Sequence, residues 1–477
     1  MIITGLAVGA VLGIVMQRGR FCVTGMLRDI FLQRSWRTFV GLLVVIAVHA
    51  VGLAALTSAG VITPTYDNFA PAAVILGAFI FGFGIILSGG CASGTWYRSG
   101  EGLVGSWIAL ATYAVSTAAM KTGVLSGFTN FMFSWETELT TLPALFGISV
   151  WWFVVPFAAL TIYLVRHFLT LEAKRPKIAR LGNQPAWKRP LHVYTAGALI
   201  GLIGVIAWPL SAAAGRNSGL GITTPTAHTL QYITTGDESY LNWGVMLVLG
   251  ILVGSFIAAR STGEFRVRVP DSVTSVRSVI GGTMMGVGAS LAGGCTVGNG
   301  MVQTSLFSFQ GWIALLFIAI GVGVAAKIFL KPATAAKKKT PDTGTYSTEQ
   351  SLANETVTSA EDRVLKVADN PAVSPAPLGG LKMATGLINI QPAVSEKLRE
   401  LGDGYYALDS LGAVCPFPLI EAKDVMQDLQ SGQHLVIDFD CTQATDAIPQ
   451  WCATDGHEVT DFRETGEASW QITVKKG

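Results

Sequence analysis

The sequence predicts a polytopic α-helical membrane protein with an inverted internal repeat, followed by a flexible linker and a small α+β domain. Half of the 477 residues are hydrophobic and only 13% are charged, a composition typical of chains that face lipid. Apolar runs of about the length of a membrane span recur up to residue 330, and a motif of glycine and cysteine occurs in both halves of this region. These observations favour a membrane protein over a soluble enzyme.

Nine apolar runs are candidate transmembrane helices, because a span needs about 20 mainly apolar residues. The first run is expected to be a retained helix, since it lacks both a basic n-region and a small-residue cleavage site. The nine runs cover residues 2–16, 39–56, 72–87, 103–120, 142–165, 193–210, 243–259, 279–291 and 312–330.

The distribution of lysine and arginine predicts the orientation of these helices. Basic residues are frequent in some connecting segments and absent from others, and cytoplasmic loops are the ones enriched in Lys and Arg. Nine spans then place the N-terminus in the periplasm and the C-terminus in the cytoplasm. The basic segments are 18–37, 166–189, 260–277 and the residues after 327; the segments without Lys or Arg are 57–71, 123–141 and 221–242.

Two glycine-rich motifs recur in the same order. Residues 19–25 are echoed by 215–221, and 89–94 by 293–298. In the predicted orientation Cys22 and Cys91 lie toward the cytoplasm, whereas Ser218 and Cys295 lie toward the outside. The halves, about 1–170 and 190–332, are therefore expected to be inverted, as in transporters that build a site at the bilayer midplane. The alternative is that these glycines only let helices approach each other.

The glycine-rich breaks predict short re-entrant segments whose backbone N–H groups, including those near Gly90 and Gly294, could bind an anion. Arg20 and Arg216 are matched across the repeat, and each could attract an anion. Arg20 could instead belong only to the basic cytoplasmic cluster. Arg216 is less easily explained in that way, because it lies in a predicted outer loop.

Cys22, Cys91 and Cys295 each lie in a repeated glycine motif rather than on an apolar helix face. A buried cysteine is often only a small hydrophobic residue, but three coincidences with the breaks favour a function. No CxxC pair and no histidine near in sequence accompanies them, so a metal site is not expected from these residues; a site built from residues distant in sequence is the alternative. No cofactor is expected. A thiol is a weak, soft donor that can hold a ligand and release it.

The chain divides into a membrane part (1–332), a flexible linker (333–402) and a soluble domain (403–477). The linker is rich in Ala, Thr, Pro, Ser and Lys, and a short helix is expected at 394–401. The soluble domain is expected to have a two-layer βαβαββ fold. Its predicted elements are a strand at 405–409, a helix at 416–429, a strand at 435–440, a helix ending at 455, and strands at 457–463 and 469–474.

Cys415 directly precedes this first helix in the motif Cys-Pro-Phe-Pro. Proline at the helix start, here Pro416 with Pro418 behind it, places Cys415 near the positive end of the helix dipole, which favours a thiolate. Cys415 is therefore the predicted nucleophile and persulfide carrier; the alternative is a structural cysteine. Cys441 could be a resolving thiol or inert, and Cys452 is expected in the core.

The first 330 residues resemble the YeeE/YedE family of sulfur-transport membrane proteins through Cys22, Cys91 and Cys295, and the C-terminal domain resembles the TusA-like (SirA-like) sulfur carriers through the Cys-Pro-x-Pro motif. The resemblance implies an hourglass-shaped thiosulfate importer in the bacterial inner membrane, in which the three cysteines relay the ion by hydrogen bonds. It also implies a sulfur-handling domain inside the cell. Ser218, opposite Cys22 in the repeat, makes the relay asymmetric.

The predicted function is uptake of thiosulfate, followed by sulfane-sulfur handling at Cys415. The membrane part is not expected to be an enzyme, whereas the soluble domain could be a sulfurtransferase. Expected partners are the lipid bilayer, a contact between the two domains and a downstream sulfur acceptor, but no nucleic acid. The alternatives are transport of another sulfur or selenium species, a membrane-anchored sulfurtransferase, and a thiol redox relay, which would need paired cysteines.

Overall fold

We describe the protein from a computed structural model of the 477-residue chain. The structure describes residues 2–174, 186–270, 272–330, 398–413 and 417–477, which belong to one compact unit. Most of the predicted linker lies outside these residues.

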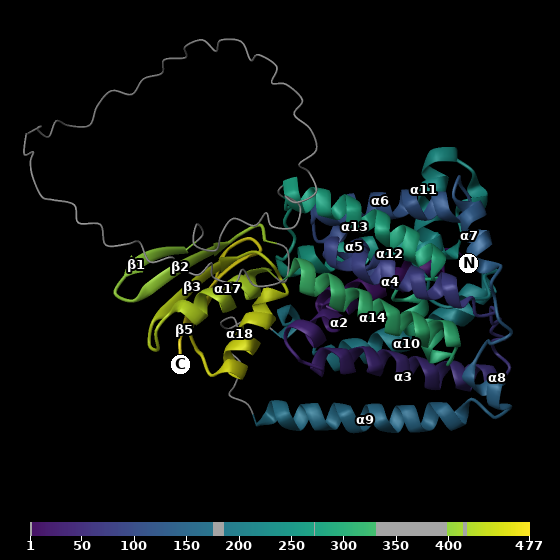
Figure 1. Ribbon diagram of the computed structural model, residues 1–477, viewed down its shortest axis with the longest axis horizontal. Coiled ribbons are helices and arrows are strands. Elements are labelled where there is room, and N and C mark those ends of the chain that lie inside the picture. The colour runs from purple at the N-terminus through teal and green to yellow at the C-terminus, as the bar shows by residue number, and fades with distance from the viewer. Residues whose placement is uncertain (1, 175–185, 271, 331–397, 414–416) are drawn as a thin grey trace, which may run out of the picture. The chain divides into compact units, whose positions relative to one another are not determined.

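The described residues up to 330 form fourteen α-helices and three short turns of other helix types (Figure 1). Several α-helices are interrupted and resume after a few residues, as the glycine-rich motifs predict. The α-helices are α1 (Ile3–Arg18), α2 (Val23–Leu32), α3 (Arg37–Ser58), α4 (Pro71–Leu87), α5 (Ala92–Gly100), α6 (Val104–Lys121), α7 (Ser126–Phe133), α8 (Leu142–Phe146), α9 (Trp151–Ala173), α10 (Val193–Ala213), α11 (Thr223–Thr235), α12 (Trp243–Thr262), α13 (Ser272–Leu291) and α14 (Phe309–Phe329); the others are η1 (Ala186–Lys188), η2 (Glu238–Tyr240) and η3 (Gly298–Gln303).

Seven helices among the described residues are long and apolar enough to cross a membrane, or eight if α6 and α7, which bend by 65°, make one span. Two of the seven are the pairs α1–α2 and α4–α5, each counted across its break. The prediction of a polytopic membrane protein is thereby confirmed. Every predicted span coincides with a helix, but the span at 142–165 is interrupted at Gly147, whose φ of +63° ends α8 before α9 begins at Trp151.

The packing of the helices repeats across the two halves. Helix α1 packs along α12, and α10, which takes the place of α1 in the second half, packs along α3. In the same way α6 packs against α13, and α14 against α4. Helices α4 and α13, which occupy matching places, pack against each other. The contacts within the described residues therefore have the pairing that the sequence repeat predicts.

Glycines make the closest of these contacts possible. Gly9 on α1 lies so near α12 that an added Cβ would be 2.1 Å from the carbonyl oxygen of Leu247. Gly250 on α12 is equally close to α1, where its Cβ would lie 2.3 Å from the carbonyl oxygen of Leu6. Lipid offers little hydrophobic drive for helix association, so this backbone-to-backbone packing supplies much of the attraction between the helices.

The C-terminal domain is a five-stranded sheet covered by two helices. The strand order is β1-β2-β3-β5-β4, with β2 and β3 parallel and the other neighbours antiparallel. Leu435, Ile437 and Phe439 alternate with less buried residues along β3 and form part of the core. The elements are β1 (Leu398–Gly402), β2 (Tyr405–Ser410), α17 (Phe417–Asp428), β3 (His434–Phe439), α18 (Ala444–Asp455), β4 (Glu458–Gly466) and β5 (Ser469–Lys475).

This arrangement confirms the predicted βαβαββ order and adds one strand before it. The segment 398–401, predicted as the end of a short helix within the linker, is strand β1, paired antiparallel with β2. The helix prediction was wrong there because hydrogen bonding to the exposed edge of β2 outweighs local propensity. The folded domain thus begins at least five residues before the predicted boundary at residue 403.

We predict that Gly9→Ala lowers the melting temperature of the full chain in detergent by several degrees. The added methyl group would overlap the α12 backbone, and overpacking costs about 1–3 kcal/mol. The matched control is Gly25→Ala in α2, where the nearest atoms lie 3.8 Å and 3.9 Å from the added Cβ and alanine favours the helix. Equal melting temperatures for the two variants would show that α1 and α12 accommodate the added methyl group without loss of stability.

Candidate functional site

Each of the three membrane cysteines lies where a helix is interrupted. Cys22 precedes α2 and Cys91 precedes α5 as the N-terminal capping residue, and both have extended backbone conformations. Cys295 lies between α13 and η3. The first backbone N–H groups of a helix have no partner within that helix, so each break presents polar backbone next to a thiol. In a membrane such backbone is tolerated where it is buried in protein or lines a cavity.

The glycine pairs before Cys91 and Cys295 have two separate tasks. The first glycine of each pair, Gly89 or Gly293, has a φ of +70° or +73°, a conformation that favours glycine. The second glycine admits a polar side chain: a Cβ on Gly90 would lie 3.5 Å from Nη1 of Arg98, and one on Gly294 would lie 3.1 Å from Oδ1 of Asn299. The pairs therefore both turn the chain and leave room beside the thiols.

The three thiols are buried and lie near one another. Cys91 Sγ lies 3.4 Å from the Ser93 hydroxyl, and Cys91 lies near Cys22. Tyr113 lies near both Cys91 and Cys295, so the three cysteines are neighbours in the folded chain. The exposed fractions of Cys295, Cys91 and Cys22 are 0%, 0% and 5%, so this thiol series lies in the protein interior.

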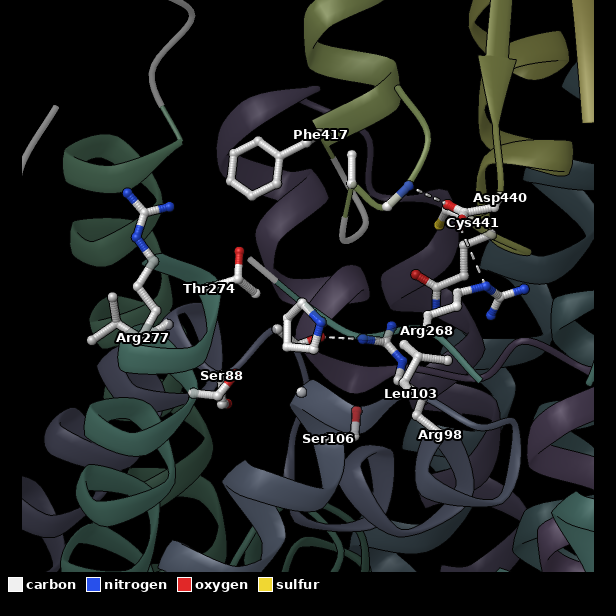
Figure 2. A pocket seen from close by; sticks show the side chains of 18 of the residues that line it. Ser88, Arg98, Leu103, Ser106, Arg268, Thr274, Arg277, Phe417, Asp440 and Cys441 are labelled. Carbon is white, nitrogen blue, oxygen red and sulfur yellow. Dashed lines mark hydrogen bonds and ion pairs between the residues drawn. The ribbon is translucent and has the colours of Figure 1, made fainter. Parts of the chain in front are cut away.

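Two cavities lie at opposite ends of the same helices. The first cavity contains Ser106 near the start of α6 and Phe329 at the end of α14 (Figure 2). The second cavity contains Lys121 at the end of α6 and Gln310 near the start of α14. The 18 residues of α6 span about 27 Å, close to the thickness of the hydrocarbon core of a bilayer. The α6 residues that line the two cavities, Ser106 and Lys121, are 15 residues apart, so the cavities lie about 22 Å apart along this helix.

Arg98 joins the thiol series to the first cavity. It lines this cavity, its Nη2 lies 3.7 Å from Sγ of Cys22, and its Nη1 donates a hydrogen bond to the carbonyl oxygen of Gly89 (Figure 2). Lys121 has the corresponding position at the second cavity, because it lines this cavity together with Gly293, two residues before Cys295. The sequence analysis missed both residues.

A signal for Arg98 was present in the sequence. Arg98 follows Cys91 by seven residues, which is two helical turns and therefore the same face of a helix. Lys121 directly follows the apolar run 103–120. In the sequence it therefore marks only the end of a predicted transmembrane helix. Its role became visible only when the fold brought the end of α6 next to the break that holds Cys295.

Arg20 and Arg216, predicted as matched residues, have different surroundings. Arg20 forms ion pairs with Glu264 at 3.2 Å and with Asp446 of the C-terminal domain at 2.6 Å. Arg216 folds back onto its own loop, where Nη1 donates hydrogen bonds to the carbonyl oxygen of Gly219 and the hydroxyl of Ser211. The Ser218 side chain forms no hydrogen bond with any described residue, although its backbone N–H donates to the carbonyl oxygen of Arg216. A role of these residues in transport stays a prediction.

The first cavity also receives residues of the C-terminal domain. Asp440, Cys441 and Phe417 line it together with the membrane helices (Figure 2). Arg268, in the segment after α12, forms an ion pair with Asp440 at 3.7 Å. Cationic side chains of the membrane part thus meet acidic side chains of the domain at this cavity.

The predicted nucleophile Cys415 and the neighbouring Pro416 lie outside the described residues. Helix α17 begins at Phe417, and Pro418 is its second residue. Cys441 is disulfide-bonded, whereas Cys452 carries a free thiol in the core of the domain. Burial raises the pKa of the Cys452 thiol to about 12, and this cysteine lies in the core, as the sequence predicts.

Comparison with known proteins identifies the two parts of the chain. Residues 18–324 match the family described as Sulphur transport. The chain belongs to this family. Residues 406–476 match the family described as Sulfurtransferase TusA. The resemblance to YeeE/YedE proteins and to TusA-like carriers, inferred from the cysteine motifs, is thereby confirmed.

Three relatives are similar to this chain over most of their own length. The chain is 47% identical over 349 residues to the thiosulfate transporter TsuA of Escherichia coli K12, an alignment that covers 71% of this chain and 98% of the relative. It is 31% identical to the thiosulfate transporter TsuA of Spirochaeta thermophila, covering 69% of this chain and all of the relative. Its C-terminal domain is 59% identical over 69 residues to TsuB of E. coli, a candidate sulfur carrier, covering 14% of this chain and 92% of that protein.

We predict that Cys452 in the folded, reduced chain resists alkylation by iodoacetamide at pH 8. With a pKa of about 12, roughly one thiol in ten thousand is ionised at that pH, and the side chain is also 1% exposed. Peptide mass spectrometry should find Cys452 unmodified in buffer and fully modified in urea. Modification in buffer at the rate of a free thiol would show that the core of the domain opens readily.

Proposed function

We propose that this protein imports thiosulfate across the bacterial inner membrane, from the second cavity through Cys295, Cys91 and Cys22 to the first cavity. The observation that carries the proposal is the presence of three buried thiols at helix breaks, together with two cavities at opposite ends of α6. The names of the two TsuA relatives support the choice of substrate. The positive-inside pattern of lysine and arginine supports an outer second cavity and a cytoplasmic first cavity.

Neutral thiols suit the interior of such a path. A thiolate would repel an anion, whereas an S–H group is a weak donor without charge. Weak binding at several positions lets an ion enter and leave, which conduction requires. Cys91, buried between its neighbours in the series, has the central place in this relay.

The C-terminal domain would then consume the imported ion. In this step the Cys415 thiolate attacks the outer sulfur of thiosulfate, a new S–S bond forms, and the old S–S bond breaks with its electron pair leaving on sulfite. The step starts from the reduced thiol of Cys415 and gives a persulfide there, and from the reduced thiol it needs no further oxidant or reductant. A sulfur acceptor protein downstream would receive the sulfur. The match to the TusA family and the Cys-Pro-x-Pro motif support this assignment.

Contacts of the domain support its place at the cytoplasmic end. The ion pairs Arg20–Asp446 and Arg268–Asp440 join cations of the membrane part to carboxylates of the domain. Gln443 of the domain also donates a hydrogen bond to the hydroxyl of Tyr97 on α5 at 3.5 Å. A domain held there would meet the ion as it leaves Cys22.

We expect Cys91→Ala to reduce uptake of ³⁵S-labelled thiosulfate to the background of cells that lack other importers. Alanine removes the central S–H donor and leaves a methyl group that cannot bind the ion. The matched control is Cys452→Ala, which also removes a buried thiol but lies outside the path. Membrane fractions must contain equal amounts of both variants. Uptake by Cys91→Ala at the rate of the unmodified chain would reduce Cys91 to a packing residue.

The second test of this function addresses the chemistry of the domain. Full-length protein exposed to thiosulfate should gain one sulfur atom at Cys415, detected by mass spectrometry of its peptides, and should release sulfite. We expect Cys415→Ser to show neither, because a serine hydroxyl without a neighbouring base has almost no alkoxide at neutral pH. Cys452→Ala should react like the unmodified chain. Undiminished sulfite release from Cys415→Ser would move the chemistry to another residue.

A further inference from the structure

Two cationic side chains lie at the two ends of the thiol series. Lys121 lines the second cavity together with Gly293, which precedes Cys295 by two residues. Arg98 lines the first cavity and lies 3.7 Å from Cys22. Between these two positions the series consists of neutral groups, the thiols and the hydroxyl of Tyr113.

Both cations have neutral partners and unused donors. Nζ of Lys121 donates a hydrogen bond to the Thr224 hydroxyl at 2.8 Å, which leaves further donors on its ammonium group. Arg98 donates to the carbonyl oxygen of Gly89 and to Cys22 and also hydrogen-bonds with the Tyr97 hydroxyl, which still leaves donors among the five N–H groups of a guanidinium. Within the described chain neither residue belongs to an ion pair.

A carboxylate stands near each cation without pairing with it. Asp67 lines the second cavity with Lys121, and Glu101 lines the first with Arg98. Glu101 is 4% exposed and Arg98 is 5% exposed. Both side chains are therefore buried, although they form no ion pair with each other. Burial of an unpaired cation is unfavourable, and a bound anion would relieve it. The nearby carboxylate would at the same time keep that binding weak.

We propose that Lys121 and Arg98 are the two anion-binding positions of the path, one before the thiols and one after them, and that they select a small doubly charged oxyanion. This inference rests on the proposed function, because it names the residues that hold the transported ion. Lys121 binds the oxygens of the ion at the outer cavity beside Cys295. Arg98 binds them again beside Cys22, and Glu101 helps to release them into the inner cavity.

The two positions have different kinetic roles. Lys121 meets the ion first, so its loss weakens capture and raises KM. Arg98 stabilises the ion after it has left Cys91, so its loss removes the attraction that draws the ion across the neutral thiols and lowers the maximal rate. Hydrogen bonds to charged groups are among the stronger ones, and loss of either cation should change its parameter about tenfold or more.

The test measures the initial rate of ³⁵S-thiosulfate uptake against concentration in cells that express the full chain. We expect Lys121→Gln to raise KM at least about tenfold with a similar maximal rate. Arg98→Gln should lower the maximal rate at least about tenfold. Lys121→Arg and Arg98→Lys, which keep the charge, should recover most of each loss. Lys327→Gln, at an exposed cation near the end of α14, is the matched control and should keep both parameters.

Glu101→Gln gives an independent readout that does not require removal of a buried arginine. The glutamine keeps the shape and removes the opposing charge, so Arg98 should hold the ion longer, with a lower KM and a lower maximal rate. Unchanged KM and maximal rate in Lys121→Gln, or in both Arg98→Gln and Glu101→Gln, would overturn the inference. Absence of thiosulfate uptake by the unmodified chain would instead refute the proposed function itself.

Discussion

The central constraint on this structure is that backbone N–H and C=O groups within a membrane need partners. An unbroken helix satisfies them internally, but it also leaves no polar backbone for a ligand. The chain resolves this conflict by interrupting helices where other helices enclose the break. Cys22, Cys91 and Cys295 all lie at such interruptions. The same breaks therefore present polar backbone beside the thiols, as the proposed path requires.

Enclosure of the breaks depends in turn on tight helix packing. Gly9 and Gly250 bring α1 and α12 into backbone contact, and Gly77 and Gly288 do the same for α4 and α13, where a Cβ on Gly77 would lie 2.7 Å from the carbonyl oxygen of Gly288. A larger residue at these positions would separate helices that carry the breaks. The many glycines in the chain thus serve packing at some positions and chain reversal at others, such as Gly89 and Gly293.

Most of the fold could be predicted because it depends on local patterns. Apolar length identifies the spans, and the repeated glycine and cysteine motifs identify the breaks. Strand β1 was missed because four of its five residues are exposed, which leaves no alternating pattern, and its pairing with β2 is a tertiary interaction. Arg98 and Lys121 were missed for a related reason. Lys121 comes near the break at Cys295, distant in sequence, only after the two halves have packed together, and a single sequence does not encode that proximity in any periodicity.

The fusion of the two parts has a physical rationale in the proposed direction of transport. Movement of a dianion to the negative side of a membrane at 100 mV costs about 4.6 kcal/mol of free energy. At equilibrium its concentration inside would therefore be roughly two-thousandfold lower than outside. Nothing in a passive series of neutral thiols can oppose this gradient. In the proposed function the reaction of the C-terminal domain would oppose it, because conversion of thiosulfate to a persulfide and sulfite would keep the free thiosulfate concentration low at the exit. The ion pairs of Asp440 and Asp446 with Arg268 and Arg20 would hold that reaction where the ion emerges, so that chemistry rather than affinity sets the direction of flow.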